Sequence, residues 1–124
     1  MLLLALVTVE TGGYYLTRVV GGDVELTEFQ VGFARAGHAH AAVLLILSLV
    51  ALLYADAAGI GGRLGYPVRV LIPAAALLMP AGFFFSSMGD GRTGPNGFIW
   101  LLYIGAVVLA AGLVLLGVAL LRRR

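Results

Sequence analysis

The sequence predicts an all-α integral membrane protein, a bundle of four helices with up-down topology and both termini in the cytoplasm. Of its 124 residues, 61% are hydrophobic and 11% are charged, whereas a soluble domain has roughly 45–50% apolar and about 25% charged residues. The apolar residues also gather in four long segments, and a hydrocarbon core about 30 Å thick needs roughly 20 residues per helical crossing. We therefore expect a single transmembrane domain, 1–124.

The first two predicted helices cover residues 2–20 and 33–55. The first, LLLALVTVETGGYYLTRVV, is interrupted by Glu10 and by a Gly-Gly pair. A secretory signal peptide is the alternative for this segment, but a basic n-region is missing and a charged residue follows a short apolar run. The second contains the apolar run AAVLLILSLVALLY, which is typical of a membrane span.

The other two predicted helices cover residues 68–87 and 97–121. Pro73 and Pro80 lie within the third, where membrane helices tolerate proline because neighbouring groups satisfy the carbonyls that lose a donor. We expect kinks at these positions. The fourth is rich in Gly and Ala, which lets membrane helices approach closely. These small residues are expected to pack within the chain or to contact a second copy in a homo-oligomer.

The arginines predict the orientation. All eight basic residues are arginine, and five of them would share one side with the middle loop and the termini. The opposite side has three arginines among acidic residues. Cytoplasmic loops are enriched in Lys and Arg, and the Arg, Ala and Gly bias suggests a bacterium with a GC-rich genome, so we expect several crossings of a bacterial inner membrane. The five arginines are Arg63, Arg69 and Arg122 to Arg124.

Composition also excludes several kinds of site. Cysteine is absent, which removes disulfides and thiolate metal sites. No basic patch with interleaved aromatic residues suggests nucleic acid, and no nucleophile motif, metallohydrolase pattern or phosphate loop is found. The expected partners are the lipid bilayer and either a second copy or a larger membrane complex. No catalytic residue is proposed.

Three ionisable residues, Glu10, His38 and His40, lie inside predicted spans and away from their ends. Such a group costs roughly 2.5–3.5 kcal/mol at the centre of a span on insertion scales, so each is a candidate functional residue. Counted from the outer ends of their helices at 1.5 Å per residue, they fall in about one layer. We expect Glu10 and His38 to be partners in this layer.

Helical spacing predicts which side chains face the interior. His38 and His40 lie about 200° apart around a regular helix, so they are not expected to share one site. His38 is the expected interior residue because small residues surround it, and His40 is expected to contact the third helix or a second copy. A small and polar stripe on the first helix should face protein rather than lipid; it comprises Glu10, Gly13, Tyr14 and Thr17.

The same layer can receive Met79 from the third helix and Tyr103 from the fourth. Each of these two residues also has an explanation without a ligand. A methionine thioether fills gaps in a core, and tyrosines near helix ends belong to the aromatic belt at the membrane interface. For His38 the structural alternative is a neutral imidazole bonded to Glu10 or Tyr14. The sequence predicts a cofactor or metal site with His38 as the principal ligand. Candidate cofactor-binding residues are His38, His40, Glu10, Tyr14, Met79 and Tyr103, and candidate metal ligands are His38, His40 and Glu10.

The run RAGHAHA, Arg35 to Ala41, opens a long apolar helix. It resembles the G-H-x-H start of small four-helix membrane proteins related to subunit I of heme-copper oxidases. The resemblance covers only this stretch and implies heme ligation by His38, with His40 as a substitute. With two histidines on one helix, the six-His set of an oxidase is absent, which excludes oxygen reduction of that kind and a bis-His heme within one subunit. A heme would need Met79, Tyr14 or Tyr103 opposite His38, an empty sixth position, or a histidine from a second copy.

Three functions follow as alternatives. The first is a membrane protein with a buried polar site near the outer leaflet that binds heme b or a copper or zinc ion. The second is an oligomeric proton-coupled carrier or channel in which Glu10 and His38 relay protons. The third is an accessory subunit of a membrane complex, without chemistry and without a cofactor.

Overall fold

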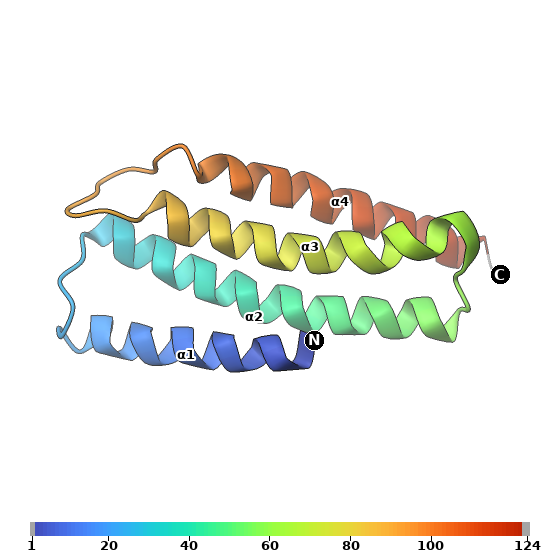
Figure 1. The fold of residues 1–124 in the computed structure, drawn as a ribbon, viewed down its shortest axis with the longest axis horizontal. Helices are drawn as coiled ribbons and strands as arrows, with labels where there is room; N and C mark the ends of the chain where they lie inside the picture. Colours follow the sequence, from blue (N-terminus) through green and yellow to red (C-terminus); the bar gives the residue numbers. More distant parts are fainter. Residues whose placement is uncertain (1, 123–124) are drawn as a thin grey trace.

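The computed structural model describes residues 2–122, which form four helices and no strand. Consecutive helices run antiparallel and lie side by side in chain order (Figure 1). α1 packs on α2, α2 on α3 and α3 on α4. The all-α four-helix bundle expected from the sequence is confirmed. Its helices are α1 (Leu2–Val20), α2 (Glu28–Ala57), α3 (Gly62–Ser86) and α4 (Ile99–Leu121).

Three helices of the described chain, α2, α3 and α4, are long and apolar enough to cross a membrane, judged by length and composition. They support the prediction of a membrane protein. α1 is not one of them, because Glu10, Arg18 and several Thr, Tyr and Gly residues dilute its apolar residues. The predicted crossing by residues 2–20 is therefore the one of four that the structure does not support.

A capping box starts α2 at Glu28, earlier than the sequence predicts. The Thr27 hydroxyl accepts a hydrogen bond from the Gln30 backbone N–H at 3.2 Å, and the Gln30 side-chain oxygen accepts one from the Thr27 backbone N–H at 3.2 Å. This reciprocal pair satisfies two donors at the helix start. The buried Gln30 amide also donates to the carbonyls of Ser87 and Gly89, at 3.0 and 2.7 Å. One side chain thus ties the start of α2 to the end of α3.

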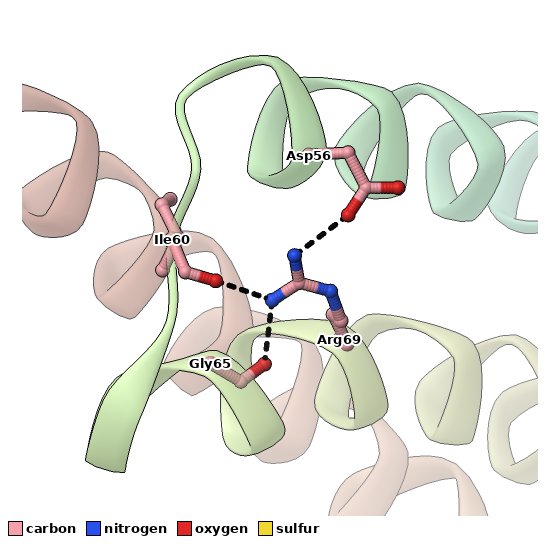
Figure 2. A network of polar contacts seen from close by, with 4 residues as sticks. All are labelled: Asp56, Ile60, Gly65 and Arg69. Atoms are coloured by element: carbon pink, nitrogen blue, oxygen red, sulfur yellow. Dashed lines mark hydrogen bonds and ion pairs between the residues drawn. The ribbon is translucent and has the colours of Figure 1, made fainter.

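Arg69 closes the turn between α2 and α3 (Figure 2). Its Nη1 donates to the carbonyls of Ile60 and Gly65, at 2.6 and 3.1 Å. Its Nη2 lies 2.6 Å from Oδ1 of Asp56. Gly62, at the start of α3, has a φ of 62°, a left-handed conformation that glycine adopts without a Cβ penalty. The turn is therefore held by one guanidinium and one glycine.

α3 remains one helix although it contains three prolines, Pro67, Pro73 and Pro80. The start predicted from the sequence for this helix is residue 68, just after Pro67. The structure instead begins α3 at Gly62 and carries it through Pro67. Neighbouring groups in a membrane bundle make such prolines tolerable.

α3 and α4 approach each other backbone to backbone. A Cβ added at Gly82 would lie 2.4 Å from the backbone N of Leu102, and one added at Gly105 would lie 2.6 Å from Cγ of Met79. Real Cβ atoms do not approach this closely, so only glycine fits. Gly105 of α4 thus packs within the chain, which is the first of the two uses expected from the sequence, whereas Ala106 and Ala110 of the same helix are exposed.

A layer of contacts crosses all four helices and sets their relative heights. We call it the histidine layer. From it α2, α3 and α4 each continue for about twenty residues, roughly 30 Å, toward the α2–α3 turn, whereas α1 continues for about ten residues, roughly 15 Å. Figure 1 accordingly shows α1 ending part-way along α2. The layer comprises Gly12, Gly37, His38, Gly82, Phe83 and Leu102.

Candidate functional site

His38 turns the nitrogen-bearing edge of its ring toward α1. A Cβ at Gly12 would lie 3.3 Å from Nδ1, and a Cβ at Gly13 would lie 3.4 Å from Cε1 and 3.6 Å from Nε2. The side chain is half-buried, and none of the hydrogen bonds between described residues involves its ring. The Gly-Gly pair of α1 therefore makes room for an imidazole that has no polar partner in residues 2–122.

A cleft of about 280 Å³ lies beside His38, between α1, α2 and α3. No charged side chain lines it, and most of its wall is small or apolar. Gly12 lines this cleft together with His38, whereas Gly13 does not. We call this space the three-helix cleft; its lining residues are Ala5, Thr8, Val9 and Gly12 of α1, His38, Ala41 and Leu45 of α2, and Ala76, Leu77, Pro80 and Phe84 of α3.

His40 faces α3 and does not line the three-helix cleft. Its Nδ1 lies 2.8 Å from the carbonyl oxygen of Ala36, and since a carbonyl only accepts, Nδ1 carries the proton and donates. Its ring lies 4.9 Å from that of Phe83, centroid to centroid, with planes inclined by 38°. The two imidazoles thus have different neighbours, and His40 makes the expected contact with the third helix.

Glu10, Tyr14 and Thr17 lie exposed on α1, so the prediction that their stripe faces protein is wrong for these three residues. Gly13, the fourth member, does lie against His38. α1 instead packs a row of apolar and small residues, three and four positions apart, on α2. Packing this row on α2 avoids the free-energy cost of burying a carboxylate without a partner. It comprises Leu2, Ala5, Leu6, Val9 and Gly12.

The expected pairing of Glu10 with His38 is also wrong as a direct contact. Glu10 is exposed, and the two residues of α1 that lie against His38 are Gly12 and Gly13, about 200° and 300° further around the helix. The carboxylate therefore lies outside the contact between α1 and the imidazole. No hydrogen bond or ion pair between described residues joins them.

The remaining candidates do not converge on His38. Met79 is buried against Gly105 of α4. Tyr103 is exposed and packs edge-on against Trp100, with ring centroids 5.6 Å apart. Tyr14 is exposed on α1. Within residues 2–122, no group of three or more His, Asp or Glu side chains is placed to hold a metal ion.

A second cavity of about 440 Å³ lies toward the loops and shares Phe84 with the three-helix cleft. Its wall includes the polar residues Gln30, Ser87 and Asp90.

Sequence reasoning found His38 but missed Gly12 and Phe84 as its neighbours in the three-helix cleft. The available signal for Gly12 was the Gly-Gly pair inside an apolar helix, since helix-interior glycine lowers stability and marks a close approach of another group.

Comparisons of the chain with protein-family models, with curated proteins and with solved structures found no match. The likeness to relatives of heme-copper oxidase subunit I therefore stays a prediction from the residues of α2. The function has to be argued from the geometry of the three-helix cleft.

Proposed function

We propose that this chain is a multi-pass protein of a bacterial inner membrane that binds a ligand in the three-helix cleft through His38. Three apolar helices support the membrane location. Ligand pockets are mostly apolar with a few polar groups, and ionisable residues within membrane segments are functional candidates by default. One observation carries the proposal: His38 and Gly12 line the same cleft, and the His38 ring, which lies against Gly12, has no hydrogen-bond partner among residues 2–122.

Charge supports an orientation with the α2–α3 turn in the cytoplasm. The C-terminus lies at that end (Figure 1). Five of the eight arginines belong to the α2–α3 region or follow α4 in the sequence, against three among acidic residues at the opposite end, and cytoplasmic ends are enriched in arginine. Arg123 and Arg124 lie outside the described residues. A reporter fused to the C-terminus should be cytoplasmic; a periplasmic reporter would contradict this orientation. Because α1 reaches only half the depth of the other helices, the cytoplasmic N-terminus stays a prediction.

The sequence favours heme b or a copper or zinc ion as the ligand. A heme iron can be held by one axial histidine, which His38 would supply. Copper or zinc needs several donors, and His38 is the only imidazole that lines the cleft. A metal ion would therefore need donors from a second copy, and a heme at Nδ1 would need α1 and α2 to separate at Gly12.

The test is to purify the full chain from cells supplied with a heme precursor and with copper and zinc. An absorption spectrum, metal analysis and mass spectrometry of an organic extract should reveal a bound species near one per chain. His38→Ala should lose it. His40→Ala is the matched control, since it removes an imidazole from the same helix outside the cleft, and it should keep the ligand. An empty wild-type protein, or full occupancy in His38→Ala, would contradict the proposal.

The outer face of α1 favours a second candidate, a non-catalytic subunit of a larger complex. It carries exposed Leu3, Leu4 and Val7 next to Glu10, a mixture that suits a protein partner better than lipid or water alone. Isolation in mild detergent should then yield one dominant partner that Glu10→Leu releases. The proton-carrier alternative has less support, because no hydrogen bond or ion pair between described residues joins Glu10 and His38.

A further inference from the structure

The three-helix cleft has a polar end and an apolar end. His38 and Phe84 lie at one end, close to the histidine layer. Leu45, seven residues further along α2, lies roughly 10 Å deeper. The other polar side chain, Thr8, donates its hydroxyl hydrogen to the Ala5 carbonyl at 2.6 Å. Beyond the imidazole, the cleft therefore offers no side-chain donor that is not already used.

The polar end lies at the height of two exposed aromatic residues on α4. Leu102 of the histidine layer stands between Trp100 and Tyr103, which are 66% and 52% exposed. Exposed Trp and Tyr on membrane helices mark the boundary between headgroups and hydrocarbon. His38 is therefore near this boundary, and the apolar end of the cleft lies within the hydrocarbon. The cleft has the polarity and orientation of a lipid-like molecule in the bilayer.

We propose that the cleft binds a neutral amphiphile with a flat, carbonyl-bearing head, of the isoprenoid quinone class, with its head at His38 and its tail along Leu45. This inference rests on the proposed function and names its ligand class. A ring N–H of His38 donates to a head carbonyl, and Phe84 offers an aromatic surface to a flat ring. A carboxylate or phosphate head finds no arginine side chain in the cleft.

The cleft is small. Its volume of about 280 Å³ lies just below the usual range for ligand pockets, roughly 300–1,000 Å³, so it would hold one small ring with the first part of a tail. Gly12 and Ala41 leave the wall beside His38 without large side chains. The rest of the tail would lie in the bilayer. The inference concerns binding alone.

The experiment titrates the purified full chain in detergent with a benzoquinone that carries a ten-carbon tail, and in parallel with palmitate. The quinone should bind at one saturable site. His38→Ala should weaken it about tenfold, the loss expected for one hydrogen bond of about 1.4 kcal/mol. His40→Ala should leave the affinity unchanged.

Gly12 and Gly13 provide a matched pair. Both lie against the His38 ring, but only Gly12 lines the cleft. Gly12→Ala should weaken quinone binding severalfold, while Gly13→Ala should have a much smaller effect. Should His38→Ala fail to fold, Gly12→Ala and Phe84→Leu keep the test in force, and an unchanged quinone affinity in both would overturn the inference.

The outcomes of these experiments distinguish the quinone inference from the proposed function. Preferential binding of palmitate that depends on His38, or a heme or metal ion that His38→Ala releases, would overturn the quinone class and leave the proposed function standing. A folded wild-type protein that binds neither probe and contains no bound species would overturn both.

Discussion

Glycine plays different roles on the two sides of the bundle. Between α3 and α4, added Cβ atoms would come within 2.4 to 2.8 Å of the facing helix, in one case of its backbone. Between α1 and α2, added Cβ atoms would meet only the His38 side chain, at 3.3 and 3.4 Å. The glycines between α3 and α4 allow the two helices to approach closely and leave no space for a Cβ. The glycines between α1 and α2 leave space for the imidazole ring of His38 beside the cleft. The glycines are Gly82, Gly105 and Gly112 on one side and Gly12 and Gly13 on the other.

The largest effect is expected for Gly82→Ala. Its Cβ would lie 2.4 Å from the backbone N of Leu102, so α3 and α4 must separate, and overpacking of this kind costs about 3 kcal/mol at the upper end of its usual range. Thermal unfolding in detergent measures the loss. Gly117→Ala on α4 is the matched control, because nothing lies within 4 Å of its Cβ position, and it should be neutral or slightly stabilising. Equal stability of both variants would remove the contrast between the two sides.

A somewhat smaller loss, about 2 kcal/mol, is expected for Gln30→Leu. The change leaves the carbonyls of Ser87 and Gly89 without their donor in a largely buried place, and such unsatisfied groups cost about 1–3 kcal/mol. Glu28→Gln is the control, since Glu28 is exposed in the same helical turn. The free energy of unfolding should separate the two variants clearly. Similar values would mean that this connection between α2 and α3 adds little.

Arg69→Ala should cost about 1.5 kcal/mol through loss of its bonds to the carbonyls of Ile60 and Gly65, at the lower end for hydrogen bonds with a charged group. Asp56→Asn should cost less, because Asp56 is exposed and exposed ion pairs contribute about 0–1 kcal/mol. Denaturation curves of the two variants provide the measurement. The reverse order would assign the stability of the turn to the ion pair rather than to the carbonyl bonds.

The helices were predictable from the sequence because each contains a long apolar run. The earlier start of α2 was also readable, since Thr27 and Gln30 have capping-box spacing. The start of α3 before Pro67 was not, because local preference disfavours helix next to proline and the contacts of Arg69 with residues of the preceding turn overrule it. Local sequence thus predicts that the helices exist, whereas contacts between helices determine where some of them begin.

The site was less predictable, for a physical reason. Two faces of α1 repeat at helical spacing, one with Glu10 and Tyr14 and the other with Ala5 and Val9. The choice between them depended on the assumption that α1 crosses the bilayer. In the structure Glu10 lies near the histidine layer and is exposed. The three-helix cleft depends on the relative heights of three helices, which no local pattern encodes.

The smallest effect, and the sharpest test of the comparison, is expected for Gly12→Ala. Alanine favours a helix interior by roughly 0.5–1 kcal/mol over glycine, and the contact with the ring of His38 at 3.3 Å should offset most of this gain. In a His38→Ala background the contact is gone, so the same change should stabilise the protein by about 0.5–1 kcal/mol. Gly82→Ala should not be rescued by Leu102→Ala, because the obstacle there is a backbone atom that every residue retains. An identical effect of Gly12→Ala in both backgrounds would show that the glycine does not make room for the imidazole. Rescue of Gly82→Ala by Leu102→Ala would show that the α3–α4 contact is as adjustable as the α1–α2 contact.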